Sequence, residues 1–302
     1  MKKTIKSIIK KAPGFDKLNL LRCRINQFFK NDETFIRERY EAIFGRELNL
    51  ENPKTFNEKI QWRILKDRKD IYTQLADKYL VRDYVKEKIG EEYLIKLLGV
   101  YKRAGDIDYD RLPNKFVLKC NHDSGSVIIC KDKSTFNKKE ANRKLNFFLK
   151  RNFYDMTREW HYKNIKPLII CEEFLEENGK APKDYKFHIF NSSKDRNIFI
   201  QCDMNRFDGH KRSMLNENWE LTEFEYKKKS PKTIPKKPLK FNEMKKLALK
   251  LSEDFEMSRV DFYEINGKIY FGEITFTSEA GTGIFYPDEW DYKLGDMWEL
   301  KR

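Results

Sequence analysis

Residues 258–276, SRVDFYEINGKIYFGEITF, constrain the fold of this chain most strongly, because two strand-like runs surround an Asn-Gly turn signal. Two registers are open for this hairpin. A two-residue turn would place Asp261 and Glu273 on opposite faces, whereas a three-residue loop over residues 265–267 would place both on one face. The longer loop separates polar from apolar side chains cleanly, and we therefore predict that register.

In the predicted register, one face of the hairpin carries a basic group, two carboxylates and a hydroxyl. These groups belong to Arg259, Asp261, Glu273 and Thr275. Carboxylate oxygens are ligands that Mg²⁺ prefers, and a nearby cation neutralises charge in phosphoryl transfer. The pattern indicates a magnesium–nucleotide site. Taken alone, the same residues also fit a solvated patch of surface ion pairs.

The rest of the chain alternates between helical and strand patterns. The spacing of apolar residues predicts mostly helices over residues 15–97, including a helix over 74–90, and again over 134–164 and 241–255. Residues 227–240 are basic and contain prolines, which predicts an exposed connector. Short apolar runs predict strands at 115–120, 126–130, 166–174, 184–191 and 197–204. Helices around antiparallel strand pairs indicate an α+β fold.

The segment KCNHDSGSVIIC, residues 119–130, joins two of these strands. Lys119 ends a buried strand, where an ammonium group is costly unless it meets an anion. Ser124, Gly125 and Ser126 are small enough for backbone N–H groups to approach phosphates. Most short loops of this kind are ordinary turns, so this segment alone is compatible with either role.

Two further pairs of charged residues also admit two interpretations. Glu172 and Glu173 end a buried strand, where each is either a satisfied edge residue or a ligand-binding group. Lys78 and Arg82 share one face of the predicted helix, which either faces solvent or contributes to a site.

The charge of the chain suggests an anionic partner. The net charge is +14, from 62 Lys and Arg against 48 Asp and Glu, although a lysine-rich composition alone would also produce it. The five cysteines form no CxxC pair, so we expect reduced, buried thiols and a cytoplasmic protein. Near the first residue, Ile5, Ile8 and Ile9 would form one apolar stripe among lysines, which is compatible with contact to an anionic membrane surface.

In chain order, the segments ADKYLVRDYV, FVLKCNHDSGS, IICEEFLE, DYKFHIF, SRVDFY and GEITFTSEAGTG resemble the ATP-grasp superfamily. More narrowly, PKTFNEKIQW, DYKFHIF and VDFY followed by IYFGEITF resemble its TupA-like branch, found in teichuronopeptide and capsular polysaccharide biosynthesis. The resemblance covers most of the chain. It implies an ATP-grasp fold of the α+β class, with the nucleotide between two α+β subdomains. The expected parts are a helical N-terminal region (1–75), a small subdomain with the phosphate loop (76–170), and a hinge and large subdomain with the metal site (171–302).

The resemblance also implies which residues contact ATP. The loop 123–126 would cover the phosphates, and the strand 168–175 would form the hinge and contact the adenine and ribose. The full set of expected nucleotide-binding residues is Lys78, Lys119, Asp123, Ser124, Gly125, Ser126, Glu172, Glu173, Phe174, Leu175 and Asp184.

Lys186 and Arg259 would be the catalytic residues, with Lys186 facing the phosphates or the substrate and Arg259 at the reacting phosphate or the acyl phosphate. Asp261, Glu273 and Thr275 would hold Mg²⁺, with two ions expected. Thr275 stands where the family often has asparagine, so water or another residue would complete the coordination.

Asp123 is a second departure, because the branch often has glycine there. A carboxylate in the loop would repel phosphate unless it points away or caps a neighbouring N–H group. Proline and glycine are also expected near Ser278 and Glu279.

The implied reaction is ADP-forming carboxylate–amine ligation. ATP phosphorylates a carboxylate to an acyl phosphate, and an amine then attacks to form an amide. The branch implies a uronic acid or an amino acid on a glycan precursor as substrate. The basic surface would suit an acidic glycan or peripheral contact with the inner membrane face, and no nucleic-acid partner is expected.

Three other functions remain open. DIDYD, residues 106–110, contains the DxD pattern of glycosyltransferases at Asp108 and Asp110, but no doubly wound nucleotide-sugar domain follows it. A non-catalytic basic binding module would need neither ATP nor the hairpin carboxylates. A kinase would stop at phosphoryl transfer.

Overall fold

The fold is taken from a computed structural model, which describes residues 30–177, 179, 181–193, 195–204, 209–228 and 233–301. The predictions for the first residues of the chain, including the stripe of Ile5, Ile8 and Ile9, lie outside the described residues. No helix in the described ranges is both long and apolar enough to cross a lipid bilayer.

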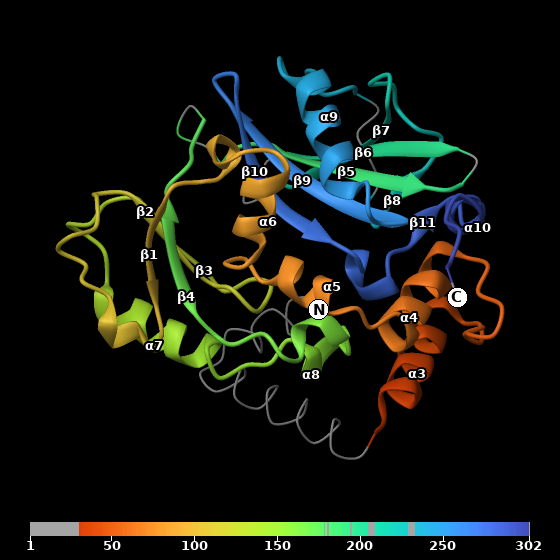
Figure 1. The fold of residues 1–302 in the computed structure, drawn as a ribbon, viewed down its shortest axis with the longest axis horizontal. Coiled ribbons are helices and arrows are strands. Elements are labelled where there is room, and N and C mark those ends of the chain that lie inside the picture. Colours follow the sequence, from red (N-terminus) through yellow and green to blue (C-terminus); the bar gives the residue numbers. More distant parts are fainter. Residues whose placement is uncertain are drawn as a thin grey trace, which may run out of the picture.

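Two antiparallel sheets form the framework of the protein (Figure 1). The four-stranded sheet has the order β1 (Leu97–Tyr101), β4 (Ile169–Glu173), β2 (Phe116–Cys120) and β3 (Val127–Cys130). The five-stranded sheet has the order β10 (Lys268–Thr275), β9 (Met257–Ile265), β5 (Asp184–Asn191), β6 (Arg196–Met204) and β7 (Lys211–Asn216). A short pair joins β8 (Glu225–Tyr226) to β11 (Phe285–Tyr286). The strands predicted from the sequence are confirmed.

Helices surround the two sheets, as the sequence predicts. The α-helices are α3 (Asp32–Phe44), α4 (Phe56–Lys66), α5 (Asp70–Ala76), α6 (Val81–Lys88), α7 (Lys138–Phe148), α8 (Tyr154–Thr157), α9 (Phe241–Ser252) and α10 (Glu289–Asp296). Short 3₁₀ turns are η1 (Glu91–Tyr93), η2 (Ala104–Asp106), η3 (Trp160–Tyr162) and η4 (Ser278–Gly281).

The single helix predicted over residues 74–90 is wrong, because the chain breaks between α5 and α6. The Asp77 carboxylate accepts the backbone N–H of Tyr79 at 2.8 Å, which forms a local turn instead of a continuous helix. The backbone N–H of Lys78 also lacks a helical partner and instead donates to the carbonyl of Asn121 at 3.1 Å. Lys78 therefore lies in a turn and does not share a helix face with Arg82.

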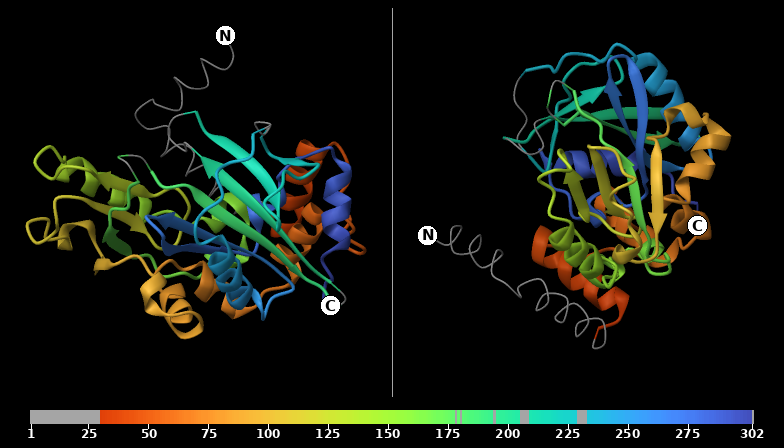
Figure 2. Two further views of the ribbon diagram at one scale, coloured as in Figure 1. Left: turned by 90° about the horizontal axis from the view of Figure 1, so that it is seen from above. Right: turned by 90° about the vertical axis from the view of Figure 1, so that its left-hand side faces the viewer.

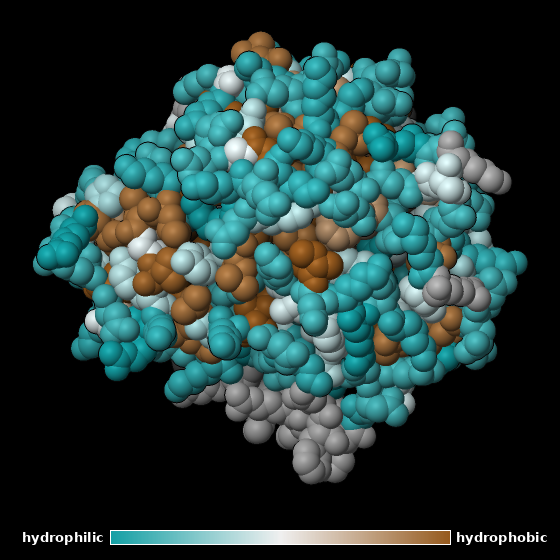
Figure 3. All heavy atoms as spheres, in the orientation of Figure 1, coloured by the Kyte–Doolittle hydropathy of each residue, from teal (hydrophilic) through white to brown (hydrophobic). Residues whose placement is uncertain are grey.

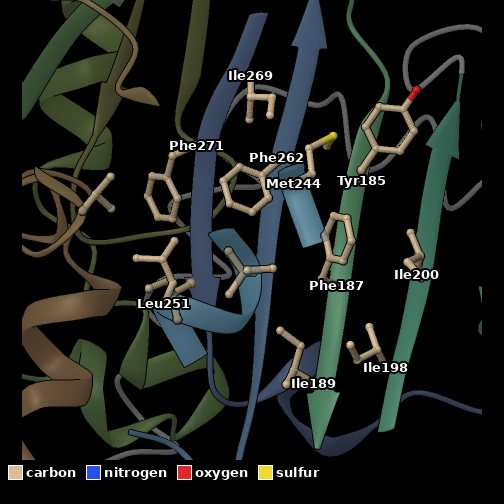
Figure 4. Close-up of a cluster of buried hydrophobic side chains, with 14 of the residues drawn as sticks. Tyr185, Phe187, Ile189, Ile198, Ile200, Met244, Leu251, Phe262, Ile269 and Phe271 are labelled. Atoms are coloured by element: carbon tan, nitrogen blue, oxygen red, sulfur yellow. The ribbon is translucent and has the colours of Figure 1, made fainter. Parts of the chain in front are cut away.

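One face of the five-stranded sheet is apolar and is covered by α9. Figure 4 shows side chains of β5, β6, β9 and β10 on the same side of the sheet as Met244 and Leu251 of this helix. Helix α9 places Phe241, Met244, Ala248 and Leu251 on one stripe, which is why it packs against the sheet. The strand residues of this cluster include Tyr185, Phe187, Ile189, Ile198, Ile200, Phe262, Ile269 and Phe271. The opposite face is apolar at the end near α4 and α10, where Phe190, Phe199 and Met214 pack, and it carries polar residues elsewhere.

Helices α3 and α4 pack at the end of the molecule where α10 also lies (Figure 2). Helix α4 starts with a capping box, in which Thr55 and Glu58 satisfy each other's backbone N–H groups. Buried Arg63 donates to the carbonyl of Met257 at 2.8 Å and to that of Phe276 at 3.1 Å, so it ties α4 to the large sheet. The division into three parts at residues 75 and 170 stays a prediction.

The cysteines and the surface agree with the composition. Cys120, Cys130, Cys171 and Cys202 are free thiols and are buried, as expected. Figure 3 shows that hydrophilic side chains cover most of one face of the molecule, with hydrophobic ones gathered mainly over the four-stranded sheet and near the centre.

Candidate functional site

The turn of the β9–β10 hairpin differs from the predicted one. It is a two-residue turn at Asn266 and Gly267, with φ values of +51° and +76°, and Ile265 lies opposite Lys268. Left-handed conformations at both central residues are typical of a type I′ turn, for which Asn-Gly is a favoured sequence. The predicted three-residue loop is therefore wrong.

A β-bulge restores the grouping of polar side chains that the turn alone would have broken. The register shifts by one residue at Gly272, so that Asp261 lies directly opposite Glu273 and Arg259 lies opposite Thr275. Glycine suits this place, since a Cβ atom on Gly272 would come within 3.0 Å of the Asp261 carbonyl oxygen. The four polar residues share one face, as predicted, for a different structural reason.

These residues form a dense cluster of charges, in which Arg259 and Asp261 are buried and Glu273 is partly exposed. Arg259 donates from Nε to Asp261 Oδ1 at 2.7 Å and from Nη2 to Glu273 Oε1 at 2.6 Å, so one guanidinium bridges both carboxylates. Lys186, opposite Asp261 on β5, bonds to that carboxylate and lies 2.7 Å from Asp184. The structure thus brings together five residues that sequence analysis assigned to catalysis, metal binding and nucleotide binding.

The pKa values in this cluster follow from burial and ion pairing. Burial raises the pKa of Asp261 to about 6, against the attraction of Arg259 and Lys186. Burial also acts to raise the pKa of Glu273, but Arg259, Lys186 and Lys78 outweigh it and lower that pKa to about 2. Burial disfavours the charge on Lys186, yet its neighbouring carboxylates raise its pKa. Glu273 therefore stays ionised at neutral pH, and Asp261 is the group most easily protonated.

The donor set fits a magnesium ion that is completed by other ligands. Within the described parts of the chain, no three His, Cys, Asp or Glu side chains gather closely enough to bind an ion by themselves. Asp261 and Glu273 offer carboxylate oxygens on adjacent strands, and the Glu273 side chain is 44% exposed. Mg²⁺ is commonly held by one or two carboxylates together with substrate phosphates and water.

The loop between β2 and β3 turns its carboxylate away from solvent. Asp123 is fully buried, accepts the Ser126 hydroxyl and lies 3.8 Å from the Arg151 guanidinium. Ser126 in turn accepts the backbone N–H of Cys120 at 3.1 Å. Gly125 has a φ of +93°, which favours glycine at this position. Asp123 therefore holds the loop together and does not present its charge to a phosphate.

Lys78 connects this loop to the hairpin of the other sheet. Its ammonium group donates to the backbone carbonyl of Asp123. Burial lowers the pKa of Lys78, while the charge of Glu273 on β10 opposes that change. A small cavity lined by Lys78, Lys119 and the bulge at Gly272 lies between the two sheets.

Lys119 and Glu172 form an ion pair inside the four-stranded sheet. Lys119 Nζ lies 2.7 Å from Glu172 Oε2, and Arg82 Nη1 lies 3.6 Å from Glu172 Oε1. Both Lys119 and Glu172 line the same cavity as Lys78. Glu173 is exposed at the end of β4, and Phe174 and Leu175 follow it half-buried. Contacts of these last three residues with a nucleotide stay a prediction.

Sequence analysis missed a second layer of residues next to the hairpin. Glu159, which is buried, accepts the hydroxyl of Thr277 two residues after β10. Arg39 on α3 donates to the carbonyl of Thr157 at 3.0 Å and to that of Ala280 at 3.1 Å. Burial raises the pKa of Tyr162 well above its ordinary value, and Glu159 and Glu273 add to this. No pattern marks these residues, because they meet only through tertiary contacts.

The DxD segment lies at the surface. Asp108 pairs with Arg111 at 3.2 Å, and Asp110 pairs with Lys138 at 2.8 Å, with side chains that are 56% and 87% exposed respectively. This placement fits an acidic surface loop.

Comparison with solved structures finds weak overall likenesses to ligases. N5-carboxyaminoimidazole synthetase from Staphylococcus aureus, in complex with ADP, has 15% identity and a TM-score of 0.40, with 67% of this chain and 44% of that chain covered. D-alanine–D-alanine ligase from Helicobacter pylori has 19% identity and a TM-score of 0.40, with 67% and 54% covered. L-amino acid ligase from Bacillus licheniformis has 13% identity and a TM-score of 0.45, with 84% and 57% covered. This chain thus spans only about half the length of these proteins.

No curated protein sequence matches the chain significantly. A family model does match: residues 58–299 correspond to the family described as TupA-like ATPgrasp. This match covers most of helix α4, both large sheets and the charged hairpin. It confirms the resemblance found in the sequence and, with it, the ATP-grasp fold of the α+β class. We conclude that the chain belongs to the TupA-like ATP-grasp family.

Proposed function

We propose that this protein is an ATP-dependent, ADP-forming ligase that joins a carboxylate to an amine through an acyl phosphate. The observation that carries the proposal is the guanidinium of Arg259, which bridges Asp261 and Glu273 beside the buried ammonium of Lys186. Such a cluster combines ligands for a metal with cations for a transferring phosphoryl group. Membership of the ATP-grasp family supports the same chemistry.

We further propose that ATP lies between the two sheets. Lys78 and Lys119 line a cavity that faces the hairpin, which supports a role for both at the phosphates. Residues 123–126 would cover the phosphates with backbone N–H groups, since Asp123 is turned inward. The end of β4 would contact the adenine through residues 173–175, with Glu172 near the ribose.

Asp261 and Glu273 would hold Mg²⁺, with Thr275 beside them on the same face. When bound, the metal would supply positive charge that offsets the charge of the phosphates. Arg259 would exchange some of its hydrogen bonds to these carboxylates for hydrogen bonds to the reacting phosphate. Lys186 stays between Asp184 and Asp261 and would keep a positive charge next to the reacting phosphate.

In this reaction, the protein's own residues position the carboxylate for in-line attack on the terminal phosphate and neutralise the developing charge. Closure of the site would keep water from hydrolysing the acyl phosphate before the amine arrives. The amine then attacks the acyl carbon, and phosphate leaves.

We propose a uronic acid or amino acid of a surface polysaccharide precursor as the carboxylate substrate, in the cytoplasm or at the inner membrane face. The net charge of +14 supports an acidic glycan or an anionic lipid surface as a partner. Binding to acidic and to uncharged glycans across a salt series tests this part. Salt-insensitive binding would contradict it, because exposed charges are screened by salt.

A screen for ADP release tests the ligase activity. Uronic acids and amino acids are paired with a panel of amines, and hydroxylamine is added to trap any acyl phosphate as a hydroxamate. A ligase gives a hydroxamate, whereas a kinase acting on an alcohol gives ADP alone. Turnover of a sugar nucleotide without ATP would instead support a glycosyltransferase.

A matched pair of double variants controls the screen. Asp261→Asn with Glu273→Gln should abolish ADP release, because both variants remove carboxylates of the charged hairpin. Asp108→Asn with Asp110→Asn removes two surface carboxylates and should leave the rate unchanged. Equal effects of the two pairs would contradict the assignment of the site.

A further inference from the structure

The polar face of the five-stranded sheet continues beyond the charged hairpin to its opposite edge. On this face, Asp184 of β5 lies opposite Asp203 of β6, and Asp203 lies opposite Arg212 of β7. Burial acts to raise the pKa of Asp203, but Arg212 outweighs it and lowers that pKa. The positive charge of Lys186 makes a smaller contribution to the same lowering. Charged residues on this face therefore extend from Glu273 on β10 across the sheet to Arg212 on β7.

Asp203 is held rigidly in this row by three donors. Its carboxylate accepts Gln201 Nε2 at 2.7 Å and Arg212 Nε at 2.8 Å. The third donor is His210 Nε2, at 3.0 Å from Asp203 Oδ1. The side chain of Asp203 is only 3% exposed, so its orientation and that of the imidazole are well determined.

The second nitrogen of His210 faces an amine. Lys228 Nζ lies 2.7 Å from His210 Nδ1. A carboxylate only accepts hydrogen bonds and an ammonium group only donates them, so the neutral imidazole must carry its proton on Nε2 and offer a lone pair from Nδ1. The structure thus shows a primary ammonium group donating to an imidazole that is backed by a carboxylate.

His210 is also the histidine that a substrate can reach. Its side chain is 22% exposed, whereas the other three histidines of the sequence are buried. Burial lowers the pKa of His161 and of His188 to about 3, so these two are unsuited to accept a proton at neutral pH. Among the residues that the structure describes, the charged groups around His210 include Asp203 on β6, Arg212 on β7, Lys228 after β8, and Glu279 on η4 through its contact with Arg212.

We propose that His210 and Asp203 form the subsite for the acceptor amine and that His210 takes up its proton. The proposal rests on the ligase function above and identifies which group prepares the nucleophile. Two strand spacings of about 4.8 Å each separate β9 from β6. Asp203 also lies four residues along β6 from Phe199, the residue level with Arg259, so the terminal phosphate, the acyl group and the amine would together extend along the row from Asp261 to His210. Lys228 occupies the position that the substrate amine would take.

The proposed step is balanced without a further reactant. The amine enters as an ammonium group, displaces the Lys228 side chain and gives one proton to His210 Nδ1, and Asp203 stabilises the imidazolium. The lone pair of the amine nitrogen then forms the C–N bond, and the C–O bond to phosphate breaks with its electron pair on the phosphate oxygen. The second proton moves from nitrogen to the departing phosphate, and the imidazolium then returns its proton to water.

The test compares two nucleophiles in full-length His210→Gln, with the best acid from the ADP-release screen. Methylamine is almost fully protonated at neutral pH and needs a base, whereas hydroxylamine is largely unprotonated and does not. At pH 7 we expect amide formation with methylamine to fall by about 10²- to 10⁴-fold, the usual contribution of a general base. Hydroxamate formation should change by less than about threefold, and the loss with methylamine should shrink as the pH rises.

Lys211→Gln is the matched control, because it removes an exposed charge next to His210 without touching the imidazole. It should leave both rates unchanged. Equal losses with both nucleophiles in His210→Gln, or no loss with either, would overturn the assignment of His210 while leaving the ligase function intact. Failure of the wild-type protein to form hydroxamate from any acid would overturn the ligase function and this subsite with it.

Discussion

Asp261→Asn should make the protein more stable at neutral pH while it abolishes activity. Asp261 is 1% exposed and carries two of the hydrogen bonds of Arg259. Burial nevertheless outweighs these contacts, since the pKa of Asp261 is raised from 3.8 to about 6. In the absence of metal and nucleotide, the ionised form of this carboxylate is therefore unfavourable to folding.

The magnitude follows from the linkage between proton binding and folding. A carboxylate whose pKa is higher in the folded than in the unfolded state lowers the stability of the protein progressively as the pH rises from the unfolded pKa toward the folded pKa. Each pKa unit corresponds to 1.36 kcal/mol, so the rise from 3.8 to about 6 corresponds to at most about 3 kcal/mol. Asn resembles the protonated carboxyl and does not titrate. The advantage of the variant over wild type should therefore grow between pH 4 and pH 7.5 by up to about 3 kcal/mol.

The assay is urea unfolding of both proteins at several pH values, without nucleotide or Mg²⁺. Glu273→Gln is the matched control on the same hairpin. The pKa of Glu273 is lowered to about 2, so its ionised form favours folding. That contribution is present above its unfolded pKa and is lost as the pH falls through about 2, so Glu273→Gln should be less stable than wild type at neutral pH.

One result would refute this reasoning. If the free-energy difference between Asp261→Asn and wild type stays constant or falls as the pH rises, the ion pairs with Arg259 and Lys186 outweigh burial. The buried carboxylate would then be a source of stability, and its retention would need no functional explanation.

Three further predictions concern the bulge, the loop and helix α4. Gly272→Val places a Cβ 3.0 Å from the Asp261 carbonyl, so it should destabilise the hairpin by about 1–3 kcal/mol in urea unfolding and abolish ADP release, with Gly272→Ala milder. Asp123→Ala removes the acceptor of the Ser126 hydroxyl, and calorimetric titration should show about tenfold weaker ATP binding, or about 1.4 kcal/mol. Arg63→Met leaves two buried backbone carbonyls without their donor and should lower stability by about 1–3 kcal/mol each in thermal unfolding. Wild-type behaviour of any of these variants would contradict the contact that motivates it.

The charged hairpin illustrates how far sequence reasoning reaches. The requirement that polar and apolar side chains occupy opposite faces correctly predicts that Asp261 and Glu273 lie together. The way the chain meets that requirement was not predictable from the same pattern. An Asn-Gly turn favours two residues, and the one-residue mismatch is absorbed at Gly272, where the close approach to Asp261 leaves no room for a side chain.

The break between α5 and α6 has a similar cause. Apolar spacing over residues 74–90 fits one helix, but the Asp77 side chain competes for backbone N–H groups, and Asn121 accepts the N–H of Lys78 from another element. The hydrogen bond between Lys78 and Asn121 joins residues that are far apart in the sequence. It also brings Lys78 to the phosphate loop, where its ammonium group reaches Asp123.

The sequence by itself determined the α+β class, the strands, the family resemblance and the pairing of Asp261 with Glu273, because these follow from local periodicity and from the residue types on one hairpin face. Only the tertiary structure decided the inward orientation of Asp123, the position of Glu159 beside Thr277 and the contact of His210 with Asp203 and Lys228. Each of these depends on which distant segments pack together. The energy of a buried charge depends on the groups that these segments place around it, and no local sequence pattern predicts which groups those are.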